Sequence, residues 1–218
     1  QLKQVFMTKN DLFILTASGT GSLEAAIVNT LSPGDRVIAA TAGAFGDRFV
    51  DMVEAYGADV KRMDFEWGGP IAPGDIRKAL QDDPTVKAVL VTHNETSTGV
   101  THPVEEIAKV VKGEFDKLFL VDAVSSLGCI PLPVDAWDCD MVGTASQKGF
   151  MIPPGLSFIS VSEAAWEAQQ TAKMPRFYFD LAMAKQYLAT GQTPFTPNLS
   201  AMYGLSRALD VLLEEGME

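Results

Sequence analysis

Cysteine, histidine and positive charge are all scarce in this chain of 218 residues. The two cysteines, Cys129 and Cys139, stand ten positions apart without a CxxC motif, and the two histidines do not cluster with them. A zinc site is therefore not expected, and although a disulfide stays open, reduced thiols in a cytoplasmic protein are favoured. Lysine and arginine number 17 against 28 acidic residues, and the net charge of −11 argues against nucleic acids and anionic membranes as partners.

Long hydrophobic runs are also missing. No apolar stretch approaches the ~20 residues that a membrane-spanning helix needs, and residues 1–10 lack the apolar core of a signal peptide. A hydrophobic content of 47% with 21% charged residues is typical of a globular protein. The chain starts without methionine, and residues 212–218 resemble the interior of a helix hairpin. We therefore expect a piece of a longer polypeptide.

Short apolar runs alternate with helix-period segments through most of the chain. Strands are predicted at 12–16, 36–41, 59–63, 86–92, 118–122, 140–144 and 156–161, and helices at 20–31, 47–56, 75–80 and 104–111. This order predicts an α/β fold, a mostly parallel, doubly wound sheet with helices on both faces. After residue 162 only helices are expected, including 179–189 and 200–215, with a boundary near Pro194–Pro197.

A lysine and a carboxylate suggest the chemistry. Lys148 lies in a small-residue loop, Gly143–Gly149, and Asp122 ends an apolar strand 26 positions earlier. A lysine can hold pyridoxal phosphate (PLP) as a Schiff base, and a carboxylate can keep the cofactor's pyridine nitrogen protonated. Either residue alone is more often an ordinary surface lysine or strand end. The PLP interpretation therefore depends on whether the residues at the other strand ends also suit the cofactor.

Three further strand ends carry polar or glycine-rich sequence. Ser18–Gly21 leads from a strand into a helix, where free backbone amides favour an anion, although Ser18 or Thr20 could equally be a simple N-cap. Phe45, between glycines, could stack on a planar ring or belong to the core. The run Thr92–Gly99 is too polar for a core turn. It contains His93, a general-base candidate that could equally be structural.

Four motifs in order resemble one known family. Ser-Gly-Thr-Gly with Leu-Glu-Ala-Ala (18–26), Glu-Thr-Ser-Thr-Gly-Val (95–100), Val-Asp-Ala-Val-Ser-Ser-Leu-Gly (121–128) and Gly-Thr-Ala-Ser-Gln-Lys (143–148) are similar to the class-V, fold-type-I PLP aminotransferases of the serine–pyruvate/alanine–glyoxylate group. The resemblance implies the large domain of a PLP transferase, with a seven-stranded-type sheet, over residues 1–195. Residues 196–218 would begin the helical connection toward a small C-terminal domain, and an N-terminal segment would be missing.

The resemblance also implies roles for individual residues. Lys148 would be the Schiff-base lysine and Asp122 the partner of the pyridinium nitrogen. The cofactor contacts would be Ser18, Gly19, Thr20 and Gln147 at the phosphate, Phe45 and Val124 on the two faces of the ring, and Thr96 at the ring hydroxyl. Ser126 would lie on the substrate side. Thr196, within Thr193–Pro197, would donate to the phosphate of a neighbouring subunit, which implies a homodimer with shared active sites.

The implied activity is a two-stage transfer of an amino group. A small amino acid (alanine, serine or aspartate) would be the donor, and a 2-oxo acid such as glyoxylate or pyruvate the acceptor. The family holds the substrate carboxylate with an arginine of the C-terminal domain, and neither Arg176 nor Arg207 matches a motif for that role. We therefore do not expect turnover by this piece alone.

Two alternatives differ from a transaminase. A cysteine desulfurase-like PLP lyase typically carries one histidine before the lysine and another over the ring, where this sequence has Gln147 and Phe45. A non-catalytic protein on the same fold would have little reason to keep both Asp122 and Lys148. Some family members are labelled soluble hydrogenase subunits, but metal–hydride chemistry would call for clustered cysteines, and no metal is expected.

Overall fold

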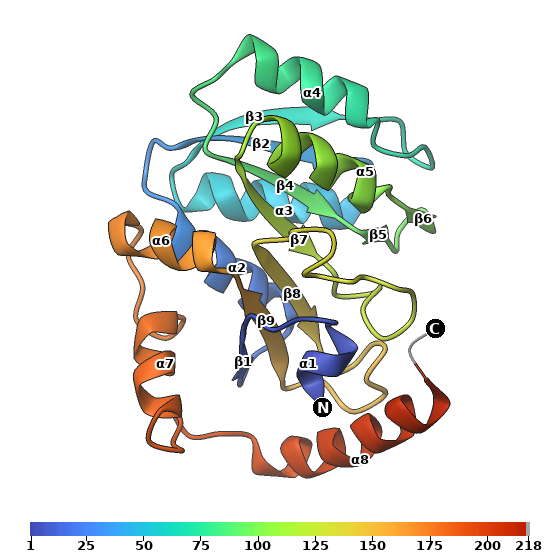
Figure 1. Cartoon of the computed structure of the whole chain (residues 1–218), viewed down its shortest axis with the longest axis vertical. Helices are drawn as coiled ribbons and strands as arrows, with labels where there is room; N and C mark the ends of the chain where they lie inside the picture. Colours follow the sequence, from blue (N-terminus) through green and yellow to red (C-terminus); the bar gives the residue numbers. More distant parts are fainter. Residues whose placement is uncertain (217–218) are drawn as a thin grey trace.

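A seven-stranded sheet forms the centre of the computed structural model, which describes residues 1–216 (Figure 1). Its strand order is β1-β9-β8-β7-β4-β2-β3. The strands are β1 (Asp11–Leu15), β2 (Arg36–Thr41), β3 (Asp59–Asp64), β4 (Ala88–Thr92), β7 (Leu118–Asp122), β8 (Met141–Ala145) and β9 (Ser157–Val161). Within this sheet β9 alone runs against its neighbours. The predicted mostly parallel α/β sheet is therefore confirmed.

Helices cover both faces of the sheet, as predicted. One face carries α2 (Gly19–Thr30), α3 (Ala44–Ala55), α6 (Glu163–Thr171) and α7 (Leu181–Leu188). The other carries α1 (Leu2–Val5), α4 (Pro73–Asp82), α5 (Val104–Ala108) and α8 (Leu199–Glu215). Successive residues of a strand point to opposite faces, so Val37 of β2 lies in one core and Ile38 in the other. The central strands read as continuous apolar runs because both of their faces are buried.

The structure departs from the predicted elements in several places. Helix α3 begins at Ala44, three residues before the predicted start, because its first amides are bonded by another loop. The predicted helix 104–111 ends as an α-helix at Ala108 and continues as a π-helical stretch, Lys109–Glu114. A short hairpin, β5 (Asn94–Glu95) and β6 (Val100–Thr101), occupies the predicted polar loop after β4.

Cys129 is exposed and Cys139 buried, and both are free. Within residues 1–216 no helix is both long and apolar enough to cross a membrane. The same part of the chain holds no group of three or more His, Cys, Asp or Glu side chains arranged to bind a metal ion.

The order of the strands creates a crevice at one edge of the sheet. From β2 the chain passes through α3 to β3, and it returns through α4, on the opposite face, to β4 on the other side of β2. The connections after β2 and β4 therefore diverge, and ligands of open α/β sheets bind at such points, beyond the carboxyl ends of the strands. Strands β8, β7, β4 and β2 are consecutive neighbours, so their following loops form one continuous edge.

Candidate active site

The first turn of α2 packs directly against the loops that follow β7 and β8. A Cβ atom built on Gly19 would lie 2.7 Å from Val124 Cγ2 and 3.2 Å from the Cβ of Ala145. The hydroxyl of Ser22 donates to the carbonyls of Gly19 (2.8 Å) and Thr144 (3.3 Å). The glycine is therefore required by close packing, and the start of α2 shares one edge with the ends of β7 and β8.

The N-terminus of α2 is open to an anion. Ser18 occupies the N-cap position, yet its side chain makes no capping hydrogen bond, and the first turn contains no acidic residue. Ser18 is thus the N-cap by position, but its hydroxyl does not satisfy an amide of the first turn. Free amides and the positive end of the helix dipole remain at this end, which are the features that bind a phosphate. Ser18 is exposed and Thr20 half-buried, so both hydroxyls border this end.

Asp122 ends β7 as a buried carboxylate, with 4% of its surface exposed. Its Oδ1 accepts a hydrogen bond from the amide of Val124 at 2.9 Å. Burial raises the pKa of Asp122 from 3.8 to about 6, and the negative charge of Glu95 adds to this, while the Val124 amide opposes it. A carboxylate that is costly to charge in isolation gains most from a cationic partner. Among residues 1–216, the buried hydroxyl of Ser126 in the following loop has no hydrogen-bond partner.

Lys148 follows β8 on a loop that the protein holds tightly. Ser146 anchors the loop, since its hydroxyl donates to the carbonyl of Pro153 at 2.8 Å and accepts from the amide of Leu156 at 3.2 Å. At Gly149 the loop crosses residues 127–128, and a Cβ there would lie 2.9 Å from the carbonyl carbon of Gly128.

The lysine side chain itself is unengaged. Lys148 is exposed, and its ammonium forms no ion pair within residues 1–216. The buried Oε1 of the preceding residue, Gln147, likewise has no hydrogen-bond partner in this part of the chain. The anchored loop after β8, the strand next to β7, thus carries an exposed amine and an unpartnered amide oxygen.

Phe45 lies in the first turn of α3, at the carboxyl end of β2. Its ring is half-buried, and the guanidinium of Arg48 lies 5.0 Å from the ring centroid. Phe45 is absent from both buried core clusters, so the core alternative is not supported. The amides of Phe45 and Gly46 both donate to the side chain of Glu95, at 3.0 Å and 2.9 Å. Glu95 begins one of the four sequence motifs, but sequence reasoning assigned it no role of its own, and the lack of a capping side chain at Gly43 was a signal for its contact with α3.

The segment after β4 contains an exposed and a buried candidate. Thr96 is exposed at the turn between β5 and β6. His93 is 2% exposed and lies edge-on to Trp137, with ring centroids 5.9 Å apart. Burial, reinforced by the nearby His102, lowers the pKa of His93 to about 4. His93 is therefore neutral at physiological pH and packed into the protein, which favours its structural interpretation over a general base.

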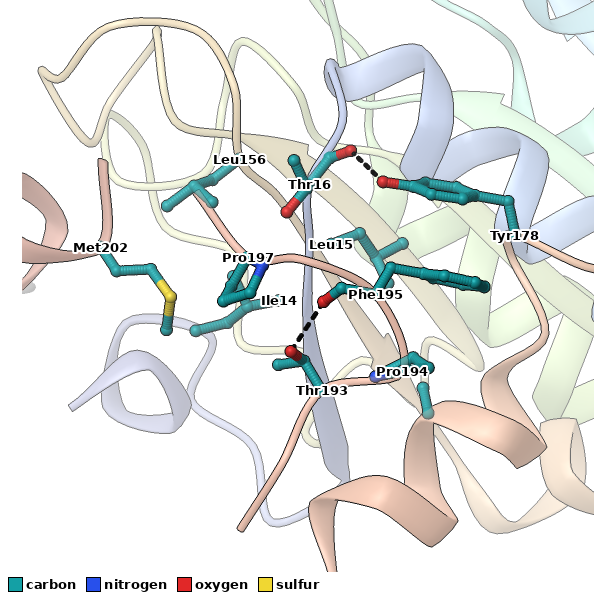
Figure 2. Close-up of a pocket in the computed structure, with 11 residues that line it drawn as sticks. Ile14, Leu15, Thr16, Leu156, Tyr178, Thr193, Pro194, Phe195, Pro197 and Met202 are labelled. Carbon is teal, nitrogen blue, oxygen red and sulfur yellow. Dashed lines mark hydrogen bonds between the residues drawn. The ribbon is translucent and has the colours of Figure 1, made fainter. Parts of the chain in front are cut away.

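Thr196 belongs to a different surface, a strap formed by residues 193–197 beside the edge strand β1 (Figure 2). The rings of Tyr178 and Phe195 stack there at 4.7 Å and 15°, and Tyr178 donates its hydroxyl to the carbonyl of Thr16 at 3.0 Å. Thr196 is exposed on the strap, and within residues 1–216 no hydrogen bond joins it to the other predicted site residues. The structure thus groups the loops that follow β2, β4, β7 and β8 with the start of α2, and leaves Thr196 outside that group.

The whole chain, residues 1–218, matches the class-V aminotransferase family, and the protein belongs to that family. A crystal structure of an alanine–glyoxylate aminotransferase from Nostoc sp. superimposes with a TM-score of 0.93 at 35% identity, covering 99% of this chain and 58% of that one.

Two sequence relatives are also similar over nearly the whole of this chain. A serine–glyoxylate aminotransferase of Methylorubrum extorquens is 41% identical, over 99% of this chain and 56% of its own length. A soluble hydrogenase small subunit of Synechococcus sp. is 47% identical, over 100% of this chain and 57% of its own length. The chain therefore spans a little over half the length of the relatives that it matches.

Proposed function

We propose that this chain is the cofactor-binding part of a PLP-dependent aminotransferase. The enzyme moves an amino group from alanine, serine or aspartate to a small 2-oxo acid such as glyoxylate or pyruvate. The observation that carries the proposal is the placement of an exposed lysine and a buried carboxylate after two adjacent parallel strands: Lys148 lies on the loop after β8, and Asp122 ends β7. Membership of the class-V aminotransferase family and the serine– and alanine–glyoxylate aminotransferases among its relatives support it.

The residues present fit PLP. The uncapped N-terminus of α2 suits the phosphate, with Ser18, Gly19 and Thr20 around it and the unpartnered amide of Gln147 nearby. There is no room for a side chain at Gly19. Its backbone can therefore approach an anion closely, as a phosphate-binding loop requires.

The ring would lie over the ends of β7 and β4. We assign Phe45 and Val124 to its two faces, Thr96 to its hydroxyl and Asp122 to its nitrogen. Ser126, buried with an unpartnered hydroxyl, would lie on the substrate side.

When bound, PLP supplies an electron sink for the α carbon of the amino-acid substrate. Asp122 would hold a proton on the pyridine nitrogen, since a buried carboxylate that is costly to charge favours a cationic neighbour. The Nζ atom of Lys148 would bind the cofactor covalently and, once released by the substrate amine, would carry the proton of the α carbon. The anchored loop from Ser146 to Leu156 would keep that amine in place between the two steps.

Neither arginine considered from the sequence suits the substrate carboxylate. Arg176 donates to the carbonyls of Val28 (3.0 Å) and Ala172 (3.1 Å), where it fixes a loop to α2. Arg207 is exposed on α8, 3.8 Å from Asp210. We therefore assign the carboxylate-binding arginine to a small C-terminal domain, beyond a large domain formed by residues 1–195 and a connection that begins at 196.

We further propose a cytoplasmic homodimer with shared active sites. The exposed Thr196, on a strap stiffened by the stacked rings of Tyr178 and Phe195, is suited to reach a neighbouring subunit. The free state of Cys129 and Cys139 agrees with a reducing compartment.

A transamination assay tests the function. The purified full-length protein is incubated with PLP, each of the three amino donors and either acceptor, and the new 2-oxo acid is measured. We expect Lys148→Ala to lower turnover by at least about 10²–10⁴-fold, because a general base of this kind contributes that much. Lys173→Ala, which removes an exposed lysine, is the matched control and should keep wild-type activity. Substantial turnover by Lys148→Ala would contradict the assignment.

A further inference from the structure

A fully buried carboxylate, that of Glu95, joins the two loops that diverge at the crevice of the sheet. Its Oε2 accepts the amides of Phe45 (3.0 Å) and Gly46 (2.9 Å). Its Oε1 accepts the amide (3.0 Å) and the hydroxyl (2.6 Å) of Ser97. Four donors thus satisfy the charge, and among residues 1–216 no cation forms an ion pair with it. A buried carboxylate held in this way fixes all of its partners, because charge-assisted hydrogen bonds are strong in a low-dielectric interior.

Helix α3 depends on this carboxylate for its N-terminus. The N-cap residue is Gly43, which has no side chain to cap the helix. The amide of Ala44 donates instead to the hydroxyl of Ser97 at 3.0 Å, so the first three amides of α3 are all bonded by residues 95 and 97. A Cβ on Gly43 would lie 2.5 Å from Glu95 Cδ and 2.6 Å from Ser97 Oγ. Gly43 therefore leaves the space that Glu95 and Ser97 need in order to cap α3.

The hydrogen bonds of Glu95 hold in place the two residues assigned to the cofactor ring after β2 and β4, Phe45 and Thr96. Phe45 donates its own amide to Glu95, and Thr96 lies between the two residues that make up the cap. Movement of the Glu95 side chain would thus displace the aromatic ring and the threonine together. These contacts join the loops after β2 and β4, at the point where the topology places ligand binding.

We propose that Glu95 is a positioning residue of the active site, which acts through Phe45 and Thr96 to hold the cofactor ring. This inference rests on the proposed PLP-dependent function. Glu95 touches neither cofactor nor substrate in this proposal, and its contribution is to set the start of α3 against the loop after β4. Its charge also reaches Asp122, whose pKa is raised by burial first and by Glu95 in addition.

The test is a double-mutant cycle on PLP affinity. Dissociation constants are measured by absorbance titration for the wild type, Glu95→Gln, Phe45→Leu and the double variant. Glutamine cannot accept all four donors, because its NH₂ group would face N–H groups. We expect Glu95→Gln to weaken PLP binding about tenfold, and we expect most of that effect to vanish when Phe45 is already leucine. Glu54→Gln, which removes an exposed carboxylate from the last turns of the same helix, should leave PLP affinity unchanged.

The outcomes separate a positioning role from a structural one. Equal effects of Glu95→Gln on PLP affinity in the wild-type and Phe45→Leu backgrounds would overturn the inference. Such a result would mean that the substitution acts through a general loss of stability and not through Phe45. If Glu95→Gln does not fold, Ser97→Ala takes its place in the cycle, since it removes two of the contacts and keeps the charge. A wild type that fails to bind PLP would overturn the proposed function and this inference together. If the wild type binds PLP through Lys148 but the effects of the two substitutions are additive, only the role of Glu95 would be overturned.

Discussion

Replacing Asp122 by asparagine should stabilise the protein in the absence of PLP. Burial raises the pKa of this carboxyl from 3.8 to about 6, so the folded protein pays for a charge that the unfolded chain carries in water. That difference corresponds to ~3 kcal/mol of unfolding free energy at neutral pH. Asparagine keeps the oxygen that accepts the Val124 amide, and it removes the charge. The Asp122→Asn variant should therefore unfold at a higher urea concentration than the wild type at pH 7.5.

The sign of the pH dependence follows from the raised pKa. The folded wild type binds more protons than its unfolded chain between about pH 4 and 6, so its stability falls as pH rises through this window. The advantage of Asp122→Asn should accordingly be about half as large at pH 5 as at pH 7.5. Asp51→Asn, an exposed change on α3, is the control and should show little difference. A cofactor-free Asp122→Asn protein that is less stable than the wild type at pH 7.5 would refute the reasoning.

Two other predictions concern the loop of Lys148 and a buried ion pair. Gly149→Ala should lower stability by about 1–3 kcal/mol and weaken PLP binding, because the new Cβ would press on the backbone of Leu127 and Gly128 and shift Lys148; unchanged values in urea unfolding and PLP titration would contradict this. Lys112→Met should cost about 3–5 kcal/mol, since it removes the cation 2.9 Å from the buried Asp140. The added change Asp140→Asn should recover part of that loss in the same unfolding assay, and no recovery would contradict the charge argument.

Most of the fold could be predicted because its signals are local. Strands such as Arg36–Thr41 and Leu118–Asp122 are apolar runs between turn residues, and the structure has them with the predicted bounds. The start of α3 could not be predicted, since it is set by Glu95 and Ser97, which are some 50 positions away in the sequence. The hairpin β5–β6 was missed for a related reason, because two-residue strands carry no periodicity.

Part of the candidate site could likewise be predicted from local sequence, and part could not. Lys148, Asp122 and the start of α2 could be proposed from residue type and from their places at the ends of predicted strands. Sequence reasoning could not decide whether Ser18 caps its helix or whether Phe45 is in the core, since both depend on contacts between distant loops. Glu95 stood in a recognised motif, but its contacts could not be predicted, because they are made to backbone amides that no side-chain motif records.

Borohydride trapping of PLP tests the central claim most directly. The purified protein is mixed with PLP, reduced with borohydride and digested, and the modified peptide is identified by mass spectrometry. Lys148 carries the cofactor in this account, so one peptide that contains Lys148 should bear the reduced PLP, and Lys148→Ala should give none. PLP fixed to another lysine, or no fixed PLP at all, would contradict the account.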